Sequence, residues 1–151
     1  MKYVRIILLI AIICATVFIW SNSLKSKTES TEQSDKVAGW IELILTSNGT
    51  QPLTETGAWI LKNLRKIAHF LEFMGLSMLI SAYKLTFPWK EKFDVFLYPP
   101  AVATVDEIIQ IFSDRGPAVA DVLLDCCGAA TGMAFVLLMA AVIGTIKSRN
   151  R

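Results

Sequence analysis

Several residue patterns that define common protein classes are scarce or missing in this sequence. The 151-residue chain has three cysteines, all inside apolar stretches, which excludes a disulfide framework. Charged residues make up only 19% of the chain, where about 25% is usual, and this composition excludes a disordered chain. The sequence has no glycine-rich phosphate loop, no cysteine nucleophile in a polar setting and no basic face. We therefore expect neither a nucleotide nor a nucleic acid among its partners.

Apolar side chains, by contrast, are abundant and lie in blocks. They make up 54% of the chain, against roughly 45–50% in ordinary domains. Residues 133–146 carry no charge at all, and Arg5 is the only charged residue within 4–20. The length allows one domain, and the blocks predict that its partner is the lipid bilayer. A secretory signal peptide is the alternative for the first block, although the uncharged run 6–20 is at the upper end of the apolar core of roughly 7–15 residues that signals use.

The hydropathy pattern predicts an all-α fold, a polytopic membrane helical bundle of about four spans. The single domain covers 1–151, and its spans lie at about 4–20, 67–83, 93–112 and 118–144. Pro99 and Pro100 interrupt the third segment. Proline can kink a span where neighbouring groups satisfy the freed carbonyls. We therefore expect the third segment to be a bent or re-entrant helix.

The polar outer loop, 21–57, contains a short interfacial amphipathic helix. Val37, Trp40 and Ile41 recur at helical spacing behind Ser34, a possible N-cap. This pattern is typical of a helix that lies in the membrane interface. A second amphipathic stretch begins at about Thr56 and continues directly into the second span.

The positions of lysine and arginine predict the orientation of the chain. With the N-terminus in the cytoplasm, the inner face carries eight basic and two acidic residues, and the outer face seven basic and six acidic. Five acidic residues remain inside the spans. An excess of basic residues marks the cytoplasmic side. We therefore predict a multi-pass protein with cytoplasmic N- and C-termini.

Ionisable and polar residues in or beside the spans form three sets, each on one helix face. They are Arg65, His69 and Glu72; Asp106 and Gln110, with Glu107 adjacent to Asp106; and Asp121 and Asp125. Most members are spaced at i, i+4 or i, i+7, which brings side chains to one face. The predicted topology places all three sets toward the outer side. A charge at the centre of a span costs about 2.5–3.5 kcal/mol, so such a cluster is a candidate functional site.

Each polar residue can be given a chemical role, with structural ion pairs as the alternative. The candidate general bases or nucleophiles are His69, Glu72, Asp106, Glu107, Asp121 and Asp125. The candidate substrate-binding residues are Arg65, Lys66, Gln110 and Arg115. A divalent cation bound by His69 and the acids is a further alternative. Because no compact metal-ligand spacing is present, we expect no metal and no other cofactor.

Gly128 and Gly132 stand four residues apart in the last span. This spacing is typical of close helix packing in membranes. The expected partner is the second or third span of the same chain, because Asp121 and Asp125 share the glycine face. A homodimer contact is the alternative.

Three stretches of the chain resemble the signature segments of the VanZ-like family. They are 65–73, 106–115, and 121–125 followed by Gly128, Ala129 and Gly132, and residues 18–23 resemble the serine-bearing end of that family's first span. One departure is local, because Ser113 and Asp114 precede Arg115 and Pro117 follows it, where the family carries proline and glycine before the arginine. The resemblance implies a multi-spanning protein of the bacterial cell membrane. The family's namesake is associated with low-level teicoplanin resistance.

Taken together, the residues and the resemblance predict a protein that binds or modifies an amphiphilic envelope molecule. That molecule would be a lipid, a lipid-linked precursor or a lipoglycopeptide such as teicoplanin. The polar cluster near the outer face would recognise it. The sequence does not separate an enzyme from a binder. Proton, ion or lipid transport without catalysis, and a purely structural cluster, are the alternatives.

Overall fold

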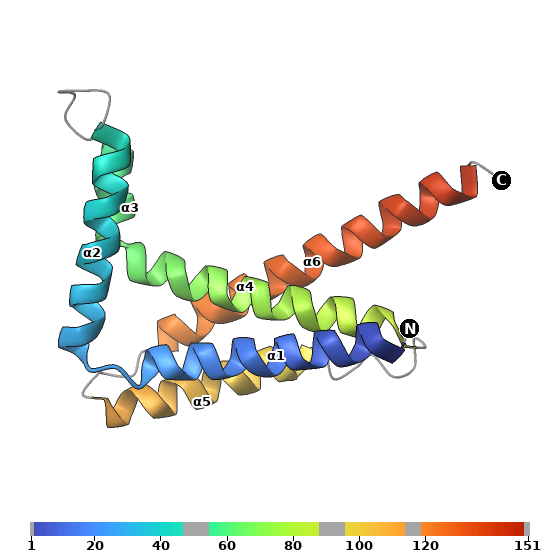
Figure 1. Ribbon diagram of the computed structural model, residues 1–151, viewed down its shortest axis with the longest axis horizontal. Helices are drawn as coiled ribbons and strands as arrows, with labels where there is room; N and C mark the ends of the chain where they lie inside the picture. The colour runs from blue at the N-terminus through green and yellow to red at the C-terminus, as the bar shows by residue number, and fades with distance from the viewer. Residues whose placement is uncertain (1, 47–54, 88–95, 114–118, 150–151) are drawn as a thin grey trace.

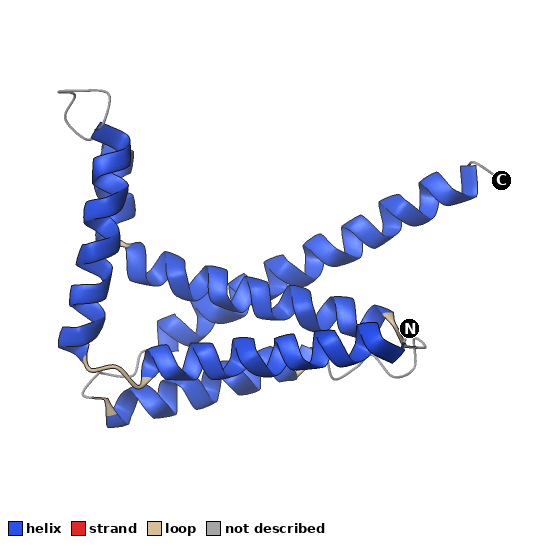
Figure 2. Cartoon of the chain, in the orientation of Figure 1, coloured by secondary structure: helices blue, strands red, loops and turns tan. Residues whose placement is uncertain are grey.

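The computed structural model describes residues 2–46, 55–87, 96–113 and 119–149, and these residues are almost entirely helical (Figure 2). The helices are α1 (Lys2–Ser23), α2 (Lys27–Thr46), α3 (Glu55–Lys62), α4 (Leu64–Leu85), α5 (Tyr98–Phe112) and α6 (Val119–Arg149). The described residues contain no strand. The all-α fold class is therefore confirmed.

The core lies where α1, α4 and α5 run alongside one another (Figure 1). Ile12 and Ile19 of α1, Phe73 and Leu76 of α4, and Val102 of α5 pack together there. α6 crosses α4, and its C-terminal half extends away from the other helices (Figure 1). α2 and α3 stand at a steep angle to α1, α4 and α5 (Figure 1). One end of the bundle is thus bordered by α2 and α3.

Contacts between the helices fix their relative directions. Thr16 and Trp20 of α1 contact α5 through the Tyr98 hydroxyl, at 3.2 Å, and the Val102 carbonyl, at 3.4 Å. Both pairs advance in the same sense along the chain, so α1 and α5 are parallel.

α4 runs the opposite way. The end of α1 meets the start of α4, where Asn22 Nδ2 donates to Glu72 Oε1 at 2.9 Å. The start of α1 meets the end of α4, where Arg5 Nε donates to Thr86 Oγ1 at 3.1 Å. α1 and α4 are therefore antiparallel.

α2 begins earlier than the sequence pattern suggested. Its N-cap is Ser26, not Ser34. The Ser26 amide and hydroxyl both donate to Glu29 Oε2 at 2.9 Å, and the Glu29 amide donates back to Ser26 Oγ at 3.3 Å. This reciprocal capping box satisfies amides that a bare helix start would leave unpaired.

α3 and α4 are separate helices, although the sequence suggested one continuous segment. The break is at Asn63, whose backbone leaves the helical region at φ −106° and ψ 13°. Its side-chain Nδ2 donates to the Trp59 carbonyl at 2.9 Å. Asparagine side chains compete in this way with the backbone bonds of a helix. The second of these helices thus starts at Leu64.

α5 contains no proline kink, because Pro99 and Pro100 lie in its first turn. An amide in the first turn has no carbonyl partner within the helix, so proline is tolerated there. The expected bend at this point is therefore wrong. With 15 residues, α5 is about 22 Å long, which is shorter than a bilayer core of about 30 Å.

Two of the described helices, α1 and α6, are long and apolar enough to cross a membrane. Only 17% of the apolar window is buried in each, whereas a core helix of a soluble protein is mostly buried. Their exposed apolar side chains include Ile10, Ile13, Leu138 and Ile143. Such surfaces fit contact with lipid. α1 also contributes Ile12 and Ile19 to the core, so it belongs to the bundle.

Candidate functional site

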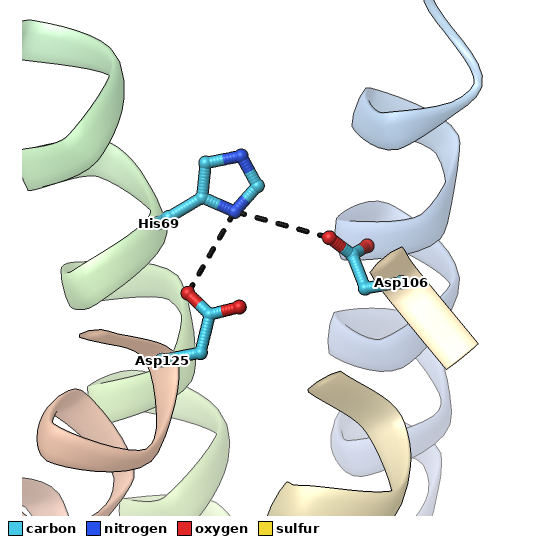
Figure 3. A group of neighbouring side chains, drawn as sticks. All are labelled: His69, Asp106 and Asp125. Carbon is cyan, nitrogen blue, oxygen red and sulfur yellow. Dashed lines mark ion pairs between the residues drawn. The ribbon is translucent and has the colours of Figure 1, made fainter. Parts of the chain in front are cut away.

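His69 lies between two buried carboxylates from different helices (Figure 3). Its Nδ1 atom is 4.0 Å from Asp106 Oδ2 of α5 and 3.9 Å from Asp125 Oδ1 of α6. The two aspartate side chains are 0% and 1% exposed, and the His69 side chain is 15% exposed. Three helices therefore bring one imidazole and two carboxylates together at one end of the bundle. We call these three residues the polar cluster.

Two glycines set the approach of α6 to α4. Neither could carry a Cβ without overlapping backbone of α4, at the Phe70 carbonyl for Gly128 and at the Met74 carbonyl for Gly132. Small residues of this kind let membrane helices approach closely. Because Gly128 meets Phe70 and Gly132 meets Met74, α4 and α6 run in the same direction where they cross. As a result Asp125, just before Gly128, reaches His69, just before Phe70.

The buried amide of Gln110 positions Asp106. Gln110 Nε2 donates to Asp106 Oδ2 at 2.8 Å, and both side chains belong to the fully buried set. The sequence placed Gln110 among the substrate-binding residues, whereas here its amide hydrogen bonds to a neighbouring acid.

The polar cluster holds more acceptors than donors. Asp106 Oδ1, Asp125 Oδ1 and Asp125 Oδ2 are buried and have no hydrogen-bond donor among the described residues. Buried polar atoms are nearly always paired in proteins. The three oxygens are therefore acceptors to which no described side chain or backbone group donates a hydrogen bond.

Glu72 belongs to a second network at the same end. It accepts a hydrogen bond from Asn22, whose Oδ1 in turn accepts one from Lys25 Nζ at 2.9 Å. Lys25 also donates to Gln33 Oε1 of α2 at 2.7 Å. Neither Asn22 nor Lys25 is among the site residues predicted from the sequence. Their signals were the position directly after the first apolar block and, for Asn22, the family resemblance of residues 18–23.

Two cavities open on either side of His69. One, of about 220 Å³, lies between α1, α2 and α4 and is lined by Asn22, Ser30, Gln33, Ser34, Val37, Leu64, Arg65, Ile67, Ala68, His69, Leu71 and Glu72. The other, of about 300 Å³, is lined by Lys62, Asn63, Arg65, Lys66, His69, Asp121 and Leu124. We call them the α2 cavity and the basic cavity. His69 and Arg65 border both.

An apolar groove of about 430 Å³ runs between α1 and α4 and adjoins the α2 cavity. Phe18, Ile19, Leu76 and Leu79 are among its walls. Leu71 and Glu72 line both the groove and the α2 cavity. The hydrophobic surface of the groove thus leads to the polar end of the bundle.

The remaining candidate residues are distributed around the polar cluster. Glu107 is buried on α5 beside Asp106 but is not part of the His69 group. Asp121 and Lys66 line the basic cavity. Arg115 lies outside the described residues. The structure therefore separates a central group from residues that line its approaches.

Comparison with known proteins gives one match. No curated protein and no solved structure matches the chain. The model of the VanZ/LLP1 family matches residues 6–140, a range that includes the polar cluster and both packing glycines. This match confirms the resemblance of the signature segments and, with the two apolar helices, indicates a membrane protein. The chain belongs to the VanZ/LLP1 family.

Proposed function

We propose that this protein binds an amphiphilic molecule of the bacterial envelope, with the head group at the polar cluster and the apolar chain in the α1–α4 groove. The observation that carries the proposal is the continuity of the two surfaces. Leu71 and Glu72 belong to both the groove and the α2 cavity. A ligand with a polar head and an apolar chain matches such a site, because ligand pockets combine apolar walls with a few convergent polar groups.

The charge of the basic cavity favours an anionic head group. Lys62, Arg65 and Lys66 line it together with a single acid, Asp121. A guanidinium presents a planar fork of donors that suits phosphate and carboxylate groups. An envelope lipid, a lipid-linked precursor and a lipoglycopeptide such as teicoplanin all combine anionic and apolar parts, and they remain the ligand class we propose.

The helix directions support a multi-pass topology with both termini in the cytoplasm. α1 and α5 run one way, and α4 and α6 run the other. Four successive crossings require this alternation. The polar cluster would then face the outer leaflet, where envelope precursors are displayed.

The topology is tested by cysteine labelling in intact cells, after the native cysteines Cys14, Cys126 and Cys127 are replaced by serine. A cysteine at Lys36 should react with a membrane-impermeant maleimide. A cysteine at Ser148 should react only after the membrane is permeabilised. Labelling of Ser148→Cys in intact cells would overturn the proposed orientation.

The amphiphile site is tested by filling the groove. A Cβ at Gly75 meets nothing within 4 Å, and Gly75 lines the groove, so Gly75→Leu should fold and block the chain. We expect mass spectrometry of the protein purified from its membrane to show an anionic amphiphile on the wild type and at least a tenfold loss in this variant.

Gly144→Leu is the matched control. Gly144 also has open space around its Cα, but it lies near the far end of α6. This variant should keep the amphiphile at the wild-type level. Equal retention by Gly75→Leu and Gly144→Leu would rule out the groove as the binding site and would favour an ion path or a structural cluster.

A further inference from the structure

We propose that His69, Asp106 and Asp125 form a binding site for a divalent metal ion of the manganese and zinc class. The site goes beyond the proposed function, because an ion can bind there whether or not an amphiphile is the ligand. It also takes up the alternative that residue spacing alone did not favour. The three donors come from α4, α5 and α6, so no local sequence motif could reveal them.

The first argument is geometric. One ligand atom from each residue can be chosen so that all three lie within 4.8 Å of one another. Metal bonds to nitrogen and oxygen are about 2.0–2.6 Å long, so two donors on opposite sides of an ion are about 4–5 Å apart. An ion placed between the imidazole and the carboxylates (Figure 3) therefore reaches all three with small side-chain rotations.

The second argument is the unmatched charge. Asp106 and Asp125 are buried, and their ion pairs among the described residues are both with His69. Three of their four oxygens lack a hydrogen-bond donor in the described part of the chain. Buried charges in proteins are paired or coordinate metals. A divalent cation would neutralise two carboxylates around a neutral imidazole.

The donor types indicate which metals fit. Imidazole suits zinc and iron, whereas carboxylates suit manganese, magnesium and calcium. A site with one imidazole and two carboxylates therefore favours manganese or zinc over magnesium or calcium. The Gln110 amide bound to Asp106 Oδ2 at 2.8 Å would act as an outer support, since ligating carboxylates are themselves hydrogen-bonded in metal sites.

The location gives the ion access to a ligand. His69 borders both the α2 cavity and the basic cavity. Three protein ligands leave positions open for water or another oxygen. If the proposed function holds, an oxygen of the anionic head group would occupy one of these positions.

The test measures metal on the purified full-length protein in lipid nanodiscs. The protein is stripped with a chelator and reloaded with Mn²⁺ or Zn²⁺, and bound metal is counted by mass spectrometry and, for Mn²⁺, by electron paramagnetic resonance. We expect about one ion per wild-type chain, with at least a tenfold loss of affinity in Asp106→Asn and in Asp125→Asn.

Asp35→Asn is the control, since it removes an exposed carboxylate of α2 that lies outside the group of three. It should keep the ion. His69→Cys provides a second readout, because a thiolate retains Zn²⁺ but is a poor ligand for Mn²⁺. This variant should therefore bind Zn²⁺ and lose Mn²⁺.

Two outcomes would overturn the metal site: a wild-type protein that binds no more metal than Asp125→Asn, or equal losses in Asp35→Asn and Asp106→Asn. Neither depends on the amphiphile. Gly75→Leu should keep the ion while it loses the amphiphile, so failure of the proposed function and failure of the metal site can be told apart.

Discussion

Charged side chains lie at both ends of the helix bundle. The charged group at one end has hydrogen-bond partners, whereas carboxylate oxygens at the other end lack them among the described residues. At the α1 start, Arg5 donates from Nε to Thr86 Oγ1 and from its terminal nitrogen to the Thr86 carbonyl. Its Cζ atom also lies 4.1 Å from the centre of the Phe87 ring. The Arg5 guanidinium therefore has hydrogen-bond acceptors and an aromatic ring face around it, and such contacts stabilise the folded protein.

The opposite end has the reverse character. There the acids Asp106 and Asp125 carry buried oxygens without a donor among the described residues. Unmatched buried acceptors oppose folding rather than support it. A contact kept for stability resembles the Arg5 end, whereas the metal ion proposed for the polar cluster would supply the partners that its carboxylates lack. Four predictions are given in order of the expected effect, and those at Arg5 and Asp125 test this difference directly.

The largest effect is expected from Gly128→Val. The new side chain would collide with the α4 backbone at the Phe70 carbonyl, which would force α6 away from α4. Overpacking costs about 1–3 kcal/mol in an adaptable core and more where backbone must move. We expect the free energy of unfolding to fall by about 3 kcal/mol or the protein not to accumulate in membranes.

Unfolding in detergent micelles measures this loss. Gly144→Val is the control, because a Cβ at Gly144 meets nothing within 4 Å. Equal stability of both variants would show that α4 and α6 are not in close contact.

The next effect is expected at the Arg5 end. Arg5→Gln removes charge-assisted hydrogen bonds to Thr86 and the contact with Phe87. Hydrogen bonds to charged groups contribute about 1.5–3 kcal/mol when well buried, and this site is half-buried. We expect a loss of about 1–2 kcal/mol in unfolding experiments, compared with Arg149→Gln, whose residue is exposed. If both variants unfold with the same free energy, the contacts of Arg5 do not stabilise the protein and the two ends do not differ in this respect.

At the polar cluster we expect a change of the opposite kind. In chelator-treated protein, Asp125→Asn replaces an unmatched buried carboxylate by a neutral amide, so its unfolding free energy should stay within about 0.5 kcal/mol of the wild type or rise. Binding of the metal ion should nevertheless be weakened at least tenfold. A stability loss of about 2 kcal/mol would instead identify Asp125 as a structural ion-pair partner.

The smallest effect concerns the capping box of α2. Hydrogen bonds from the Ser26 backbone and side chain hold the pKa of Glu29 below its usual value. A group whose folded pKa is lowered stabilises above its unfolded pKa, and this support is lost as the pH falls through the folded pKa. The protection factor for hydrogen exchange at the first turn of α2, which corrects for the intrinsic pH dependence of exchange, should therefore fall in acid, and Glu29→Gln should remove this decrease.

The sequence predicted the helical class and the face of each polar set, but not the distances between them. Periodicity placed His69, Asp106 and Asp125 on inward faces because side chains four residues apart share a face. The same reasoning could not tell which of Asp106 and Glu107 faces His69. Adjacent side chains point in different directions around a helix, and only the packing of the helices decides which direction leads to the site. The packing of α5 against α1 and α6 made that distinction.

Local signals explain the other differences. The Ser26 and Glu29 pair was visible in the sequence, yet the apolar spacing after Ser34 was the stronger pattern. The break at Asn63 depends on one side-chain hydrogen bond to the Trp59 carbonyl, which helix propensity does not report. Pro99 and Pro100 could mark either a kink or a helix start, and the position of the first turn decided between them.

The contact at Gly128 and Gly132 also makes α6 a lever with unequal arms. At 1.5 Å per residue, Asp125 lies about 7 Å from the midpoint of the contact, and Arg149 lies about 28 Å from it on the other side. A small rotation about the glycines therefore moves the far end of α6 about four times as far as the backbone at Asp125. Because that far half extends free of the other helices (Figure 1), no packing within the described chain opposes the larger swing.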